Sequence, residues 1–237
     1  MPLNPKAPLP RALSQVATRQ EVLQHAVRDV SAERWRREIA HQGLRTARGP
    51  LSEGRSITIS RQDVFGLGAR DITPENALQL WYYSVAWGLG EKGFRMRARL
   101  GGLAAAGDHA GELLCEAWTS VRAGSDPRDC YERLLTPGGR PFIRYFGSAF
   151  ATKYLYFAHG DSEPTNLVLD AVVARNLRTL GVWPSAPTTA WWSATYQAYC
   201  TLLSRWAQEL TVDPEESVRA DQLEMTLFKY RGQVTEA

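Results

Sequence analysis

Helix-start signals recur along this chain, whereas the alternating pattern of a β-strand is confined to one short stretch. Thr73-Pro74-Glu75 combines an N-cap, a proline at the first helical position and an acidic first turn. Asp170 is placed as the N-cap of another helix. The alternating stretch Ile57-Thr58-Ile59 is too short to support a sheet. The sequence therefore predicts an all-α protein.

Apolar spacing and glycine or proline breaks give the approximate bounds of the other helices. Ser31 is expected to cap the second helix of the N-terminal region. The segment 44–72, rich in Gly, Ser and Arg, is expected to be irregular. Helices are predicted within 12–43, from Thr73 to about Gly90, at 95–106, 109–123 and 127–136, around Lys153, after Asp170, from Thr188 or Thr189 to Leu210, and from Asp213-Pro214-Glu215-Glu216 to Gly232.

The composition is that of an ordinary globular protein with 44% hydrophobic and 22% charged residues. A net charge of +3 is too small to establish a nucleic-acid partner, although arginines strongly outnumber lysines. Three widely spaced cysteines form neither a disulfide framework nor a metal motif. No signal peptide or apolar stretch of membrane-spanning length is visible, so a cytoplasmic location without membrane contact is expected.

Lys153 is one of only four lysines, and it lies inside the apolar run from Tyr145 to Phe157. An arginine could supply a solvated charge there, but only a lysine amine can lose its proton on burial and attack an electrophile. The alternative is a lysine whose amine reaches water from an amphipathic helix. Asp170 follows 17 residues later and could pair with this amine, or could serve only as a helix cap.

Better-known motifs match poorly. Gly88-Leu89-Gly90-Glu91-Lys92-Gly93 has the spacing of a dinucleotide loop, but a helix precedes it and no parallel sheet is predicted. The segment from Gly147 to Tyr154 resembles a phosphate loop, yet it lacks the second glycine and the magnesium-binding hydroxyl. Neither paired histidines at metal-ligand spacing nor a serine-hydrolase elbow is present, so no metal site is predicted.

The Lys153 segment resembles the helix-hairpin-helix DNA glycosylases, the superfamily of endonuclease III and 8-oxoguanine DNA glycosylase. Ala149-Phe150-Ala151-Thr152-Lys153 is similar to their Gly-Val-Gly-x-Lys hairpin, and Asp170 to the aspartate that follows it. The whole stretch from Phe150 to Ala158, with Ala86-Trp87-Gly88 upstream, is similar to bacterial 8-oxoguanine glycosylase-like proteins. Both hairpin glycines are alanines here, which alters the approach of the backbone to DNA phosphate.

The resemblance implies a base-flipping enzyme that acts on double-stranded DNA as a monomer. Asp170 would stabilise the positive charge that develops on the sugar, and Lys153 would attack C1′ as the base leaves. A Schiff base would then allow strand cleavage. The four-cysteine iron–sulfur motif of the endonuclease III branch is absent, so no cofactor is expected.

The resemblance also assigns residues to DNA contact and to the base pocket. The loop Trp87-Gly88-Leu89-Gly90 corresponds to the segment that fills the gap left by the flipped base, although it could be a plain helix end. Hairpin contacts to the DNA backbone would come from Gly147, Ala149, Ala151 and Thr152.

Phe157, Glu224 and Phe228 would line the pocket for the flipped base. A glutamate accepts hydrogen bonds from an exocyclic amine, so modified cytosine becomes a rival to 8-oxoguanine as the excised base. Glucosylated hydroxymethylcytosine in phage DNA is one such cytosine, which would make the role one of antiviral defence. Otherwise Glu224 would occupy a solvated helix face.

A fold with two lobes and a cleft between them follows from the resemblance. Residues 1–11 would be a flexible proline-rich lead-in, and 12–72 would pack with the C-terminal lobe. Residues 73–160 would form the lobe that carries the hairpin, and 161–237 the C-terminal lobe. The alternatives to a glycosylase are a non-catalytic helix-hairpin-helix DNA-binding module and a helical interaction protein.

Overall fold

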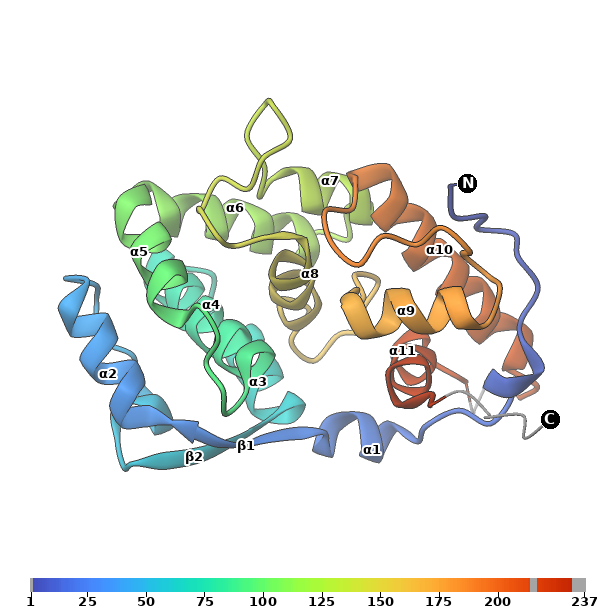
Figure 1. The fold of residues 1–237 in the computed structure, drawn as a ribbon, viewed down its shortest axis with the longest axis horizontal. Coiled ribbons are helices and arrows are strands. Elements are labelled where there is room, and N and C mark those ends of the chain that lie inside the picture. Colours follow the sequence, from blue (N-terminus) through green and yellow to red (C-terminus); the bar gives the residue numbers. More distant parts are fainter. Residues whose placement is uncertain (1, 214–216, 232–237) are drawn as a thin grey trace.

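The computed structural model describes residues 2–213 and 217–231, which are mainly helical, as predicted (Figure 1). One antiparallel pair of strands, β1 (Ala26–Ser31) and β2 (Ser56–Ser60), accompanies the helices. The α-helices are α1 (Arg19–Gln24), α2 (Ala32–His41), α3 (Arg61–Gly68), α4 (Pro74–Leu89), α5 (Met96–Ala106), α6 (His109–Arg122), α7 (Pro127–Glu132), α8 (Ser148–Phe157), α9 (Ala171–Thr179), α10 (Ser193–Leu210) and α11 (Ala220–Lys229). Short 3-10 turns occur at Arg11–Leu13 and Gly49–Ser52.

Helix α8 is the central element of the fold. In Figure 1 it lies between the group formed by α4, α5 and α6 and the group formed by α9, α10 and α11. Helices α3, α4, α6 and α7 pack against it. Every residue from Ala151 to Phe157 is buried, and the Tyr154 hydroxyl donates to the carbonyl oxygen of Leu114 on α6 at 2.9 Å. Burial on all sides fixes both the rotation and the axial position of α8.

The predicted starts of α2 and α4 are confirmed by side-chain caps. Thr73 accepts a hydrogen bond from the Asn76 amide at 3.1 Å, and Ser31 accepts one from the Arg34 amide at 3.2 Å. Helix α4 ends at Gly90, whose φ of 63° is accessible to glycine without strain. Local capping chemistry is therefore sufficient to place these helix ends.

The first strand corrects the predicted helical region 12–43. Val27 and Val30, expected on a buried helix face, lie in β1 opposite Ile59 and Ile57 of β2. Their β-branched side chains favour extended backbone, and pairing with the only predicted strand supplies the hydrogen bonds. The stretch around Ile57 therefore does support a sheet, of two strands.

Helix α3 was also not expected, because 44–72 was predicted to be irregular. Ser60 and Asp63 form a reciprocal capping box at its start, with the Ser60 hydroxyl accepting from the Asp63 amide at 3.1 Å. At its end, Gly68 lies so close to α8 that a Cβ atom there would be 1.8 Å from the Phe157 carbonyl oxygen. The close packing of α3 against α8 places Arg61 beside Tyr156.

The proline-rich start contacts the rest of the fold. Leu3 and Ala7 are buried, and the Trp206 indole on α10 donates to the Ala7 carbonyl oxygen at 2.9 Å. Prolines cannot continue a helix, but they stiffen an extended segment that places its apolar residues against a neighbour. Farther along, the Ala17 amide donates to Thr226 of α11 at 2.9 Å.

Two helix starts differ from their predictions. Helix α10 begins at Ser193 after Trp192, not at Thr188 or Thr189. Helix α11 begins at Ala220, and of its predicted start at Asp213-Pro214-Glu215-Glu216, residues 214–216 lie outside the described residues, as does the predicted end at Gly232.

His159 predicts a pH dependence of stability. Its Nε2 accepts from the Asn166 amide at 3.2 Å in the turn that leads from α8 toward Asp170, and burial lowers the pKa of His159 to about 4. In the unfolded chain His159 binds a proton near pH ~6.5, whereas in the folded chain it stays neutral at that pH. The free energy of unfolding should therefore decrease as the pH is lowered from neutral toward about 4.

Urea unfolding at a series of pH values measures this dependence. His159→Gln keeps a hydrogen-bond acceptor but cannot be protonated in this pH range. The variant should therefore reduce the slope of the unfolding free energy against pH. Part of the slope should remain, because burial also lowers the pKa of His25 to about 4. An unchanged slope in His159→Gln would contradict the assignment.

Candidate active site

Lys153 and Asp170 form a buried ion pair. The distance from Lys153 Nζ to Asp170 Oδ2 is 3.1 Å, and the two side chains are 7% and 17% exposed. Lys153 Nζ also donates to the Ala149 carbonyl oxygen at 3.4 Å. The amine lies beside the Phe150 ring, 5.8 Å from its centroid. Both partners of the predicted pair are thus in contact, and the alternative of a lysine amine extended into water is excluded.

Asp170 caps α9 and holds Lys153 at the same time. Its Oδ1 accepts from the amides of Val172 and Val173 at 2.9 and 3.2 Å, leaving Oδ2 for the lysine. Burial alone would raise the pKa of Asp170, but the Lys153 charge and the α9 amides outweigh burial and lower it. The carboxylate therefore stays ionised at neutral pH and can stabilise a positive charge close to it.

Thr152 joins the two halves of this pair. Its hydroxyl donates to the Leu169 carbonyl oxygen at 3.1 Å and accepts from the Leu169 amide at 3.2 Å. This exchange fixes α8 against the residue that precedes Asp170. Thr152 and nearly all of Ala151 are buried, and contact between their backbone and DNA stays a prediction. Gly147 and Ala149 remain partly accessible at the start of α8.

Gly88 makes room for the lysine. A Cβ atom at this position would lie 2.9 Å from both Lys153 Cδ and Phe150 Cε1. Gly88 belongs to the last turn of α4, and Trp87 before it is only 5% exposed. The predicted gap-filling segment forms the end of α4, where Gly88, Leu89 and Gly90 are partly exposed, and its contact with DNA stays a prediction.

A second buried ion pair joins α3 to α11. Arg61 donates to both carboxylate oxygens of Glu224, at 2.6 and 3.2 Å, and to the Tyr156 hydroxyl at 3.0 Å. The guanidinium carbon lies 5.2 Å from the centroid of the Trp87 ring and 5.1 Å from that of the Tyr156 ring. Burial raises the pKa of Glu224, although the Arg61 charge opposes this effect.

Glu224 is consequently neither on a solvated helix face nor a free acceptor, because Arg61 occupies its carboxylate and its side chain is 0% exposed. Phe157 is fully buried against Trp87, with ring centroids 5.2 Å apart. Phe228 reaches the same cluster through His25, whose ring lies between Phe228 and Trp87. The predicted pocket residues therefore do gather in one region, but they are packed together.

Sequence reasoning missed Arg61 and did not place His25 in this cluster. Arg61 is 1% exposed and is the first residue of α3. The signal that could have found it is the Ser60-x-x-Asp63 capping pattern, which marks the start of a helix. No local signal pairs Arg61 with Glu224, because the two are 163 residues apart in the chain.

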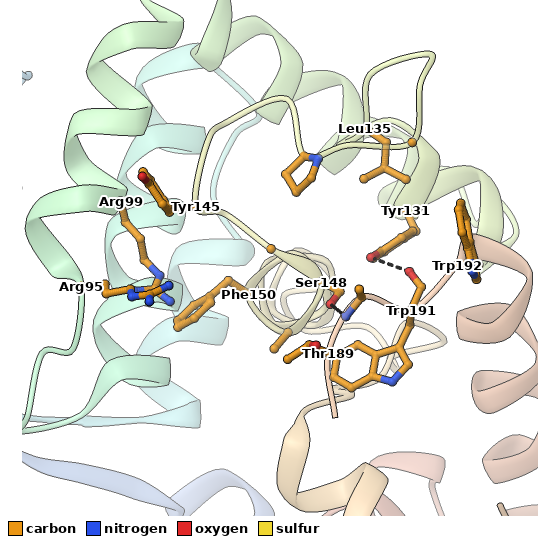
Figure 2. Close-up of a pocket in the computed structure, with 15 residues that line it drawn as sticks. Arg95, Arg99, Tyr131, Leu135, Tyr145, Ser148, Phe150, Thr189, Trp191 and Trp192 are labelled. Carbon is orange, nitrogen blue, oxygen red and sulfur yellow. Dashed lines mark hydrogen bonds between the residues drawn. The ribbon is translucent and has the colours of Figure 1, made fainter. Parts of the chain in front are cut away.

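An open cavity of about 480 Å³ adjoins the first turn of α8 (Figure 2). Gly147, Ala149 and Phe150 contribute to its wall, but Lys153 does not. Among residues 2–213 and 217–231, no group of three His, Cys, Asp or Glu side chains could hold a metal ion. Within the same residues no helix is long and apolar enough to cross a membrane.

Comparison with known proteins places this arrangement in a family. A family model described as "Putative 8-oxoguanine DNA glycosylase OGG-like protein" matches residues 20–228. The chain belongs to this OGG-like glycosylase family. No curated protein and no solved structure matched the chain. The matched range contains every residue of the Lys153 and Glu224 sites, and membership in an OGG-like family implies a DNA substrate.

The Arg61 and Glu224 pair of this OGG-like protein can be tested by a double-mutant cycle. Glu224→Ala leaves a buried guanidinium without its charge partner, which should cost about 3 kcal/mol of unfolding free energy or more. Arg61→Met combined with Glu224→Leu removes both charges, so the double variant should regain most of that loss. Urea unfolding at neutral pH measures Glu224→Ala, the two single variants Arg61→Met and Glu224→Leu, and the double variant. Additive losses in the double variant would show that the two residues are not coupled.

Proposed function

We propose that the protein is a DNA glycosylase in which Lys153 and Asp170 cut the bond between a modified base and its deoxyribose. The observation that carries the proposal is the buried 3.1 Å contact between the Lys153 amine and the Asp170 carboxylate. Lys153 lies in the second turn of α8, whose N-cap is Gly147, in a chain of the OGG-like family.

The proposed reaction uses both members of the pair. The target nucleotide leaves the base stack, and Asp170 stabilises positive charge that develops on its sugar. Lys153 passes a proton from its ammonium group to the departing base and attacks C1′ with the freed lone pair, while the bond from C1′ to the base nitrogen breaks and the base keeps that electron pair. Loss of a proton from nitrogen and opening of the sugar ring give a Schiff base. Elimination of the 3′ phosphate from this intermediate would cleave the strand.

The proposed substrate is a modified base in double-stranded DNA. An 8-oxoguanine-like purine and a modified cytosine, such as glucosylated hydroxymethylcytosine of phage DNA, are the two classes. The family description favours the purine. A glutamate at position 224 would favour cytosine through its exocyclic amine, provided that Arg61 releases the carboxylate when a base enters. Acting on phage DNA would give the protein a role in antiviral defence.

Trapping with borohydride tests the covalent step. Wild-type protein incubated with a modified or abasic duplex should give a reduced covalent adduct, and Lys153→Gln should give none. Asp170→Asn keeps the shape of the cap and removes its charge, so it should slow base release by about 100-fold or more. Denaturing gel electrophoresis detects the adduct and any strand cleavage.

The outcomes separate the possible activities. Base release without trapping would leave a monofunctional glycosylase in which Asp170 activates water. Equal trapping by wild type and Lys153→Gln would contradict attack by Lys153. Binding of modified duplex with no base release would instead favour a non-catalytic DNA-binding module, for which the two alanines of the hairpin are the supporting observation.

A further inference from the structure

The cavity beside the start of α8 is lined mainly by aromatic, small and basic residues. Five of its lining residues are aromatic, and its only charged residues are Arg95 and Arg99, with no acid among them. Figure 2 shows Phe150 between the arginines and the loop that carries Trp191. The aromatic lining residues are Tyr131, Tyr145, Phe150, Trp191 and Trp192.

Two of these aromatic side chains are exposed to solvent. Trp192 is 75% exposed and Tyr145 is 41% exposed, and they are two of the four exposed large hydrophobic residues among those described. Large aromatic side chains gain free energy on burial, so keeping both open beside one cavity is unfavourable unless something covers them.

Backbone strain is concentrated at the same cavity. Among the described residues, four residues other than glycine have a positive φ, and Arg95, Tyr145 and Ala190 are three of them. All three line the cavity. Such conformations cost of order 1 kcal/mol each and persist where the surrounding structure enforces them, often at ligand sites. Here they direct Arg95 and Tyr145 to the cavity wall.

The two arginines lack acidic partners. Among the described residues, no acid forms an ion pair with Arg95 or Arg99, and Arg99 Nε is buried without a hydrogen-bond partner. Arg99 stacks on Phe150 at 4.2 Å from the ring centroid. Burial and the charge of the neighbouring Arg95 lower the pKa of Arg99. Stacked guanidinium groups beside aromatic rings suit a ligand with a flat ring and an anionic group.

The cavity adjoins the proposed catalytic amine. Phe150 of α8 lines the cavity, and the centroid of its ring lies 5.8 Å from Lys153 Nζ. Ala149, also in the wall, accepts the hydrogen bond from that amine. A DNA strand with one nucleotide at Lys153 therefore brings neighbouring nucleotides within reach of the cavity, whose volume of about 480 Å³ accommodates a nucleotide.

We propose that this cavity binds one unpaired nucleotide of the DNA substrate, separate from the nucleotide that is excised at Lys153. The base would stack on Trp192, and a phosphate of the same strand, on the opposite side of the cavity, would contact Arg95 and Arg99. The inference rests on the proposed function for its placement next to the excised nucleotide. A preference for DNA that is unpaired beside the target base follows from it.

Binding to two duplexes tests the proposal. Both contain a stable abasic-site analogue, and they differ only in whether the adjacent nucleotide is paired or unpaired. Wild type should bind the unpaired duplex about tenfold more tightly, as measured by fluorescence anisotropy. Trp192→Ala and Arg95→Ala should each remove most of this preference. Trp192 is mostly exposed, so its truncation leaves the core intact.

Two matched variants serve as controls. Trp192→Phe keeps an aromatic face and should keep most of the preference. Arg97→Ala removes an arginine of the same helix that lies outside this cavity and should keep all of it. Equal binding of the two duplexes by wild type, or a preference that survives Trp192→Ala, would overturn the proposal. So would tight binding of a free deoxynucleotide in competition with DNA, because the occupant would then not be part of a strand.

Base release measured on a separate modified duplex keeps the two proposals distinct. If no base is released but the preference depends on Trp192, the glycosylase assignment fails and the nucleotide site remains. If base is released while Trp192→Ala binds both duplexes like wild type, the nucleotide site fails and the glycosylase assignment remains.

Discussion

The buried contact between Lys153 and Asp170 is the interaction on which the arrangement of the C-terminal half depends. An amine that is 7% exposed on the central helix is stabilised by a counter-charge, and Asp170 supplies it by holding the start of α9 against α8. Thr152 joins α8 to the residue before Asp170, and Gly88 at the end of α4 leaves room for the lysine. The positions of three segments that are far apart in the sequence therefore depend on the side chain of Lys153.

The Arg61 and Glu224 pair makes a second connection, between α3 and α11. Its guanidinium lies against the rings of Trp87 and Tyr156, in the region where the family resemblance places the flipped base. A base that enters this region must displace packed side chains, because Phe157 and Glu224 are fully buried. The cost of that displacement would fall on every base equally, whereas the final hydrogen bonds to Arg61 and Glu224 would differ between bases. Selectivity for the modified base would arise from that difference.

The elements that local chemistry defines were predictable from the sequence, and those that depend on distant partners were not. Thr73, Ser31 and Asp170 were recognised as caps because their hydrogen bonds involve residues three or fewer positions away. Val27 and Val30 fit a helix or a strand by spacing alone, and only pairing with β2 decides between them. Lys153 and Asp170 could be paired because a known motif joins them, whereas nothing in the sequence joins Arg61 to Glu224. Trp87 was predicted to contact DNA, and its burial could not be predicted from the sequence because it comes from packing against α8.

The most direct test of the glycosylase account is mass spectrometry of the free bases released from oxidised DNA and from modified phage DNA. Wild-type protein should release one modified base as a free molecule, and Lys153→Gln should release much less of it. Release of that base at equal rates by wild type and by a variant lacking both Lys153 and Asp170 would contradict the account. So would the absence of any free base from DNA that the protein binds.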